Sequence, residues 1–214
     1  RASFARLSAP HKRRAQWRVL FALSTIVHML IPLLGALRAP PLDLRFSPVG
    51  EANLARAFEL ESSSYPADEA ATEAKLLLRI REAPDFFWGA FAADGALCGF
   101  VCGTLTSAAT LTDESMSTHE PDGTTLCIHS VVTDEALRRK GVASWMLRAY
   151  LQRVAELRRV SRVLLICKQP LVGLYEGAGF RSLGPSDVVH GQDPWLLMAF
   201  DGAEEGGTDK GSLP

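Results

Sequence analysis

The sequence predicts an α/β fold of the α+β kind, in which one mixed sheet and its helices surround a single core. Three observations indicate this class. Segments with strand and helix periodicity follow one another along the chain, with two helices between the first strand and the second. An Asp94-Gly95 step joins two apolar segments and predicts an antiparallel hairpin. The run 161–167 is almost continuously apolar, as is typical of a strand covered on both faces.

The domain itself is expected over residues 43–201, after a proline-rich break at 39–41. Its first half is expected to hold a strand, two helices and the two strands of the hairpin, at 42–46, 48–63, 68–82, 86–92 and 97–105. In the second helix we expect an apolar stripe through Ala70, Ala74 and Leu77. Pro84 ends that helix because proline cannot continue it.

The second half is expected to open with a polar loop over residues 106–125, a length that is typical of functional loops. The later elements are expected to alternate between strands and helices, at 126–133, 142–159, 161–167, 170–176, 180–183 and 195–200. Residues 202–214 are rich in Gly and Glu and are expected to form a disordered tail.

Residues 1–42 form a basic and hydrophobic extension, which contains Lys and Arg but no Asp or Glu. Within it residues 19–37 are uncharged, and as a helix they would be about 28 Å long, against about 30 Å of bilayer hydrocarbon. Three interpretations stay open: a membrane anchor, a secretory or organellar presequence of the plastid type, and a helix buried on the domain. Without such a segment we expect a cytoplasmic protein. Because the chain begins at Arg1, we expect a fragment or a processed form.

The composition excludes several classes of function. A net charge of −1 lacks the basic excess of a nucleic-acid-binding protein, so no nucleic-acid partner is expected. The four cysteines lie inside apolar or strand-like segments, which favours free thiols over disulfides or a zinc site. No metal site is predicted.

The stretch 126–144 reads as a strand, a short turn and a glycine-containing loop that opens into a helix. A helix N-terminus carries unpaired N–H groups and about half a positive charge, so it can bind a diphosphate. Gly141 lets the backbone approach the ligand because it has no Cβ. Arg138, Arg139 and Lys140 add positive charge. The stretch predicts a pyrophosphate-binding loop, with an ordinary turn bearing solvated charges as the alternative.

Two motifs carry a resemblance to a known superfamily. The spacing Arg138-x-x-Gly141-x-Ala143 resembles the acetyl-CoA-binding motif of the GNAT superfamily of N-acetyltransferases. Downstream, Tyr175 precedes Gly179-Phe180 as in a second GNAT signature. The resemblance implies a GNAT-like fold, with a central, mostly antiparallel sheet flanked by helices. It also implies acetyl-CoA as the cosubstrate and a monomeric enzyme.

A narrower resemblance covers about residues 43–200. The polar loop at 111–123, the Ile128-His129 pair, the segment 171–175 and Gly184-Pro185 resemble the arylalkylamine (serotonin) N-acetyltransferase family. This resemblance implies transfer of an acetyl group to the primary amine of a serotonin-like or tryptamine-like substrate, by direct attack in a ternary complex. Two alternatives stay open: a GNAT enzyme acting on polyamines or peptide amines, and a non-catalytic acyl-CoA-binding protein tethered to a membrane through 19–37.

Acetyl transfer to an amine requires a base and an acid. His129 is the candidate base, and strand alternation is expected to place it on one face with Cys127, Val131 and Thr133. The resembled family has paired histidines, of which the first is Cys127 here. This departure puts the usual histidine relay in doubt, and a packing role for Cys127 is the main alternative. Tyr175 is the candidate acid, since a phenol can donate to a developing thiolate.

The resemblance also implies the residues that contact each substrate. The pantetheine arm is expected along the backbone of Val131, Val132 and Thr133, and Tyr175 is expected to contact the cofactor as well. The pyrophosphate is expected at the loop and first helical turn, formed by Arg138, Arg139, Lys140, Gly141, Val142, Ala143 and Ser144. The acceptor amine is expected in a pocket formed by Tyr65, Pro66, Ile166 and Trp195. Each pocket residue could instead be an ordinary core residue.

Overall fold

The computed structural model describes residues 40–188 and 191–201 of the chain, and everything below concerns these residues. The predicted anchor or presequence at 19–37 and the predicted tail at 202–214 lie outside them. Within the described ranges, no helix combines the length and the hydropathy needed to cross a bilayer. The four cysteines carry free thiols, as predicted.

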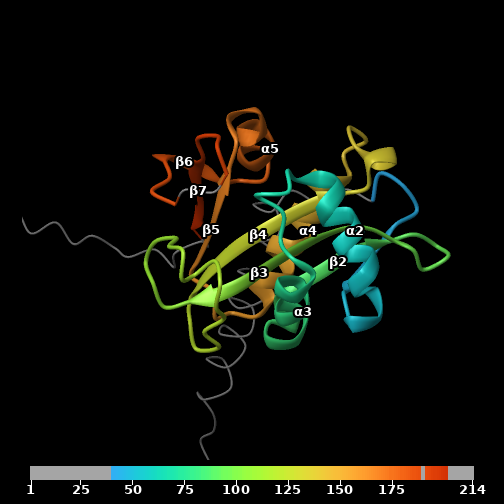
Figure 1. The fold of residues 1–214 in the computed structure, drawn as a ribbon, viewed down its shortest axis with the longest axis horizontal. Coiled ribbons are helices and arrows are strands. Elements are labelled where there is room, and N and C mark those ends of the chain that lie inside the picture. The colour runs from blue at the N-terminus through green and yellow to red at the C-terminus, as the bar shows by residue number, and fades with distance from the viewer. Residues whose placement is uncertain (1–39, 189–190, 202–214) are drawn as a thin grey trace, which may run out of the picture. The chain divides into compact units, whose positions relative to one another are not determined.

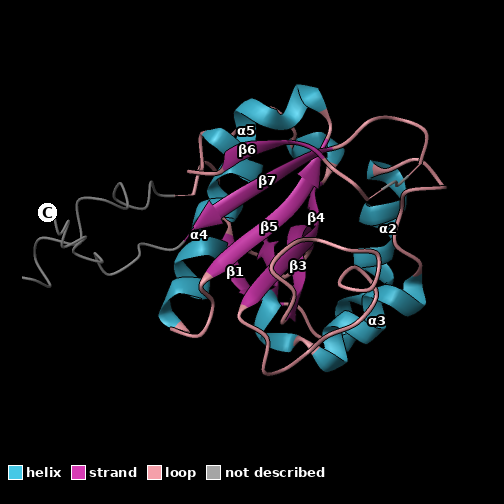
Figure 2. Ribbon diagram, turned by 90° about the vertical axis from the view of Figure 1, so that its left-hand side faces the viewer, coloured by secondary structure: helices cyan, strands magenta, loops and turns pink. Residues whose placement is uncertain are grey.

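The domain is built on one seven-stranded sheet (Figure 2). Its strands are β1 (Arg45–Pro48), β2 (Phe87–Phe91), β3 (Leu97–Thr106), β4 (Thr125–Thr133), β5 (Arg162–Cys167), β6 (Arg181–Pro185) and β7 (Leu196–Asp201). In the sheet they follow the order β1-β2-β3-β4-β5-β7-β6. The β4–β5 pair is parallel and the other neighbouring pairs are antiparallel. The predicted mixed, mostly antiparallel sheet is therefore confirmed.

Helices cover both faces of this sheet (Figure 1). On one face α2 (Leu54–Ser64) and α3 (Glu73–Glu82) bury an apolar cluster in which Leu60 and Leu76 pack with Phe100. On the other face α4 (Val142–Glu156) packs Met146 and Tyr150 onto the sheet. The short helix α5 (Val172–Glu176) leads into β6. Two helices thus lie between the first and second strands, as the sequence predicted.

The apolar stripe predicted for the second helix is wrong. Ala70 precedes α3, which begins only at Glu73, after Thr72 accepts a hydrogen bond from the Lys75 amide. The residues that α3 buries are Leu76, Arg79 and Ile80, whereas Ala74 is exposed. The buried face of this helix therefore differs from the predicted stripe and includes a cation.

A β-bulge in β4 changes which of its side chains share a face. Cys102 of β3 pairs with Ser130 and Gly103 pairs with Ile128, so His129 is the extra residue. Before the bulge Ile128 packs on the α4 side, and after it Val132 packs on the α2/α3 side. The predicted single face for Cys127, His129, Val131 and Thr133 is therefore wrong beyond His129.

A glycine lies opposite the bulge. A Cβ on Gly103 would lie 2.6 Å from the backbone oxygen of Cys127, so a larger residue would be crowded in β3 at this point. After the bulge Val131 packs against the α4-side cluster, and Thr133 pairs with Gly99, whose Cβ would touch Met146 of α4.

Candidate active site

The site lies where β4 and β5 separate. The two strands pair in parallel only over Thr125–Cys127 and Arg162–Leu164, and beyond these residues they diverge (Figure 1). Backbone groups of β4 past Cys127 therefore lack a strand partner on the β5 side within the described residues. Diverging strands leave an opening in the middle of the sheet, which other chemical groups can enter.

A cavity of about 190 Å³ lies at this opening. Its walls include five residues singled out in the sequence: Tyr65, His129, Ile166, Tyr175 and Trp195. The structure thus brings the two catalytic candidates together with three of the four acceptor-pocket candidates. Pro66 is the fourth, and it does not belong to the residues that line the cavity.

His129 is oriented by a chain of polar contacts. Its Nε2 lies 2.7 Å from Thr104 Oγ1, and the Thr104 hydroxyl lies 3.2 Å from the carbonyl oxygen of Ser115. A carbonyl oxygen can only accept a hydrogen bond, so the Thr104 hydroxyl donates to the Ser115 carbonyl oxygen. The Nε2–H of His129 then donates to Thr104 Oγ1. In this tautomer Nδ1 carries a lone pair. Nδ1 is buried and has no hydrogen-bond partner among the described residues.

The charge state of His129 follows from its burial. Burial, followed by the charges of Arg79 and Lys75, holds the pKa of His129 well below its usual value of 6.5. The imidazole is therefore neutral at physiological pH. It can accept a proton at Nδ1, but it is a weak base.

Tyr175 lies on α5 and is almost fully buried, with its ring packed edge-on against Phe180. Burial is the main cause that raises the pKa of Tyr175 far above its usual value of 10. The phenol therefore stays protonated throughout the physiological range. Such a hydroxyl can donate a hydrogen bond or a proton to an anion that forms in the cavity.

Cys127 is a packed thiol. It is fully buried and packs with Leu111, Leu164 and Ala199. Burial raises the pKa of the Cys127 thiol to about 11, so thiolate is scarce at neutral pH. Neither a relay role nor an acetyl-cysteine intermediate is favoured by this environment, and the packing interpretation fits it better.

The loop before α4 has the geometry of an anion-binding site. Gly141 has φ +81° and Arg139 has φ +61°, so both lie in the left-handed region. No side chain caps the first turn of α4, and a Cβ on Gly141 would meet no atom within 4 Å. Arg139 and Lys140 are exposed beside these amides. Free amides, local positive charge and open space fit a pyrophosphate group.

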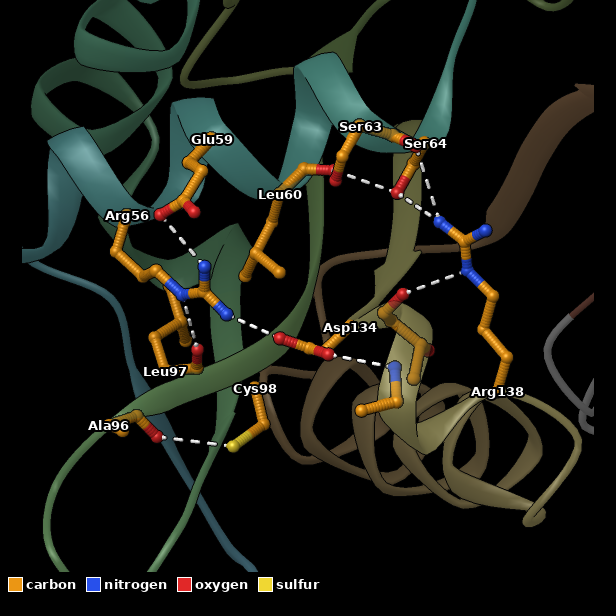
Figure 3. Close-up of polar contacts among 12 residues, drawn as sticks. Arg56, Glu59, Leu60, Ser63, Ser64, Ala96, Leu97, Cys98, Asp134 and Arg138 are labelled. Atoms are coloured by element: carbon orange, nitrogen blue, oxygen red, sulfur yellow. Dashed lines mark hydrogen bonds and ion pairs between the residues drawn. The ribbon is translucent and has the colours of Figure 1, made fainter.

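Arg138 differs from its neighbours in the loop (Figure 3). Its guanidinium donates to the carbonyl oxygens of Thr133 and Ser63 and to Ser64 Oγ, at 3.2 to 3.4 Å. These bonds tie the start of the loop to the C-terminal end of α2. Tyr65 follows immediately and contributes to the cavity wall.

A second connection joins the same two elements (Figure 3). Arg56 of α2 pairs with Asp134, whose other carboxylate oxygen accepts from the Ala136 amide at 2.9 Å. Arg56 also donates to the Leu97 carbonyl oxygen at 3.2 Å. The loop that follows β4 is thus fixed to α2 and to β3 by charged hydrogen bonds.

Several residues of the site were not predicted from the sequence. Thr104 and Ser115 orient His129, and Lys75 and Arg79 of α3 line the cavity. The only available signal for Arg79 was its position four residues after Lys75, which places both on one side of a helix.

The fold and this geometry define the class of protein. Residues 54–180 match the Acetyltransferase (GNAT) family, and the chain belongs to that family. Among curated proteins it is similar to the serotonin N-acetyltransferase of Mesocricetus auratus, with 35% identity over 98 residues, which are 46% of this chain and 47% of that protein. The corresponding protein of Homo sapiens is 30% identical over 98 residues, with 46% and 47% covered. The chain spans about half the length of these relatives.

Solved structures show the same fold at low identity. The loading GNATL domain of CurA from Lyngbya majuscula superposes with a TM-score of 0.67 at 14% identity, over 74% of this chain and 97% of that one. The GphF GNAT-like decarboxylase in complex with isobutyryl-CoA gives 0.66 at 19% identity, over 73% and 98%. The Arabidopsis thaliana NAA60 structure, in complex with a bisubstrate analogue, gives 0.58 at 19% identity, over 74% and 97%.

Proposed function

We propose that this protein transfers the acetyl group of acetyl-CoA to the primary amine of an arylalkylamine such as tryptamine or serotonin. The observation that carries the proposal is that one cavity at the β4–β5 opening is lined by His129 and Tyr175 together with Tyr65, Ile166 and Trp195. The similarity to serotonin N-acetyltransferases over 98 residues supports the same substrate class. Tyr65, Ile166 and Trp195 in the cavity wall suit an aromatic ring, while the rest of the lining includes charged and polar side chains.

For acetyl-CoA, the proposal assigns the pyrophosphate to the uncapped amides of Val142, Ala143 and Ser144, beside Arg139 and Lys140. The pantetheine arm would pair with the backbone of β4 beyond Cys127, where β5 has diverged. This path leads from the start of α4 to the cavity, so the thioester would reach the space between His129 and Tyr175. We call residues 139–144 the pyrophosphate cradle. Arg138 does not contact phosphate in this proposal, and its hydrogen bonds hold the cradle in position.

The cavity residues supply the proton transfers. The neutral amine nitrogen attacks the carbonyl carbon of the thioester, and His129 Nδ1 accepts the proton that the nitrogen releases. The C–S bond breaks, its electron pair stays on sulfur, and Tyr175 Oη donates a proton to the departing thiolate. Because His129 is a weak base, the amine must arrive largely deprotonated. Activity should therefore rise as the pH approaches the pKa of the free amine.

The volume of the cavity argues for a small acceptor. A cavity of about 150 Å³ holds one benzene molecule in a protein core. The volume here is about 190 Å³, which suits one aromatic amine better than a folded peptide segment.

The proposal is tested by measuring CoA thiol release with acetyl-CoA and a panel of amines: tryptamine, serotonin, spermidine and a peptide with a free N-terminus. The expected order of kcat/KM places both arylalkylamines above spermidine and the peptide. Release with spermidine or the peptide alone would reassign the acceptor class, and no release with any amine would contradict an acetyltransferase role.

A further inference from the structure

Arg79 is a buried cation that the transfer reaction as described does not use. Its side chain lies in the cavity wall, and only 6% of the residue is exposed. Its guanidinium makes one weak hydrogen bond, from Nη1 to Cys102 Sγ at 3.8 Å. In the described part of the chain it forms no ion pair with a carboxylate. Burying a guanidinium without a counter-ion is unfavourable, so this arrangement needs an explanation.

Three carboxylates also line the cavity, those of Glu61, Glu69 and Asp113. Glu69 pairs with Lys168 Nζ at 2.7 Å. Glu61 accepts from the Ala71 amide at 2.9 Å and from Ser130 Oγ at 3.1 Å. Asp113 is exposed on the opposite loop.

Lys75 adds a second cation one helical turn before Arg79, at the exposed edge of the cavity. The α3 wall of the cavity is thus positive, while the walls formed by Tyr65, Ile166 and Trp195 are largely apolar.

Arg79 also lies close to the candidate base. After burial, its charge is the next cause that lowers the pKa of His129. Burial raises the pKa of the Cys102 thiol, and the charge of Arg79 partly offsets that rise. A ligand whose nitrogen reaches His129 would therefore hold neighbouring substituents near the guanidinium. In an α-amino acid the carboxylate is attached to the same carbon as the amine, so both groups can be bound at once. A planar guanidinium suits a carboxylate because it can donate two parallel hydrogen bonds.

We propose that the acceptor cavity also binds aromatic α-amino acids, with the carboxylate on Arg79, the amine beside His129 and the ring between Tyr65 and Trp195. The inference rests on the proposed acetyltransferase function and extends it to a second class of acceptor. The N–C bond forms between the α-nitrogen and the acetyl carbon, and the C–S bond breaks. The amine proton goes to His129 Nδ1, and the thiolate takes the proton of Tyr175.

The test compares three acceptors that differ at one position: L-tryptophan, its neutral amide L-tryptophanamide, and tryptamine. For each enzyme the readout is the ratio of kcat/KM for L-tryptophan to that for tryptamine. A ratio removes effects common to both acceptors, including a change in the basicity of His129. Arg79→Gln removes the cation and Arg79→Lys keeps it. Arg81→Gln is the matched control, since Arg81 is an exposed arginine of the same helix that pairs with Glu51.

We expect wild type to acetylate L-tryptophan, and Arg79→Gln to lower the ratio about 10-fold to 100-fold through loss of a charged hydrogen bond. Arg79→Lys should recover part of the ratio, and Arg81→Gln should leave it unchanged. An unchanged ratio in Arg79→Gln would overturn the inference. So would a wild type that acetylates tryptamine and L-tryptophanamide but not L-tryptophan, a result that leaves the proposed function intact.

A binding measurement separates the inference from the proposed function. Calorimetry with CoA present compares N-acetyl-L-tryptophan with N-acetyltryptamine, and needs no turnover. Tighter binding of the carboxylate-bearing product, lost in Arg79→Gln, would support the carboxylate site even if no acceptor is acetylated. Equal binding of the two products would contradict the site.

Discussion

The imidazole of His129 is held by the hydroxyl of Thr104, with 2.7 Å between Nε2 and Oγ1. Thr104 lies opposite Cys127 in the β3–β4 ladder, and its hydroxyl donates a hydrogen bond to the Ser115 carbonyl oxygen. A hydroxyl and a loop carbonyl thus fix the tautomer of the candidate base. Cys127 contributes packing beside this pair.

Thr104→Val should lower kcat about 10-fold because it leaves the Nε2–H of His129 unpaired and frees the ring to rotate. The KM for acetyl-CoA should change little, since Thr104 is remote from the α4 cradle. Steady-state kinetics of CoA release measure both constants. Thr104→Ser keeps the hydroxyl and is the matched control. A valine variant as active as wild type would remove the positioning role of Thr104.

The stability of the domain should fall in acid partly through His129. The pKa of His129 in the folded chain lies well below 6.5. Below pH 6.5 the unfolded chain therefore binds a proton at His129 that the folded chain does not bind. Stability therefore decreases as the pH falls from 6.5 toward the folded pKa. His129→Gln keeps a donor for Thr104 but cannot titrate. Urea unfolding at pH 7.5 and pH 5 should show a larger loss in wild type than in this variant, and equal losses would contradict the assignment.

Gly141→Ala should weaken acetyl-CoA binding. Gly141 has φ +81°, where an alanine is strained by about 1 kcal/mol, so the loop would shift away from the conformation that presents its amides. We expect the KM for acetyl-CoA to rise several-fold and the melting temperature to fall slightly. Gly50→Ala is the control, because that glycine is equally uncrowded but has φ −106°. Similar behaviour of the two variants would argue against a cradle at Gly141.

Substitutions of the neighbouring Arg138 and Arg139 should raise the KM values of different substrates. Arg138→Met breaks the bonds to Ser63 and Ser64 and should raise the KM for the amine, since Tyr65 follows directly. Arg139→Met removes an exposed charge at the cradle and should raise the KM for acetyl-CoA, more strongly at low salt than at high salt. Kinetics with each substrate varied in turn give both constants. The reverse pattern would place Arg138 on the phosphate.

Much of the fold could be predicted from the sequence because its signals are local. The Asp94-Gly95 turn, the apolar run at 161–167 and the glycine before α4 each specify one element. The bulge at His129 could not be read from β4 alone, because it depends on how β4 pairs with β3, where Gly103 lies beside it. A glycine inside a strand pattern was the available signal.

The polar residues of the candidate site were harder to predict, because the residues they contact lie on other elements. Buried Arg79 and Ser115 contradict the usual preference of polar residues for the surface, so a hydropathy pattern does not predict that they are buried. Motif spacing predicts His129 and Tyr175 as catalytic candidates. Their orienting partners lie on other elements, at distances that no linear spacing encodes.

We propose that the acetyl group is transferred in the cavity at the β4–β5 opening, with Tyr175 as the acid. The most direct measurement compares wild type with Tyr175→Phe in CoA thiol release from acetyl-CoA and tryptamine. We expect kcat to fall about 100-fold while the KM for acetyl-CoA stays within about threefold. A phenylalanine variant with unchanged kcat and a raised KM for acetyl-CoA would contradict it.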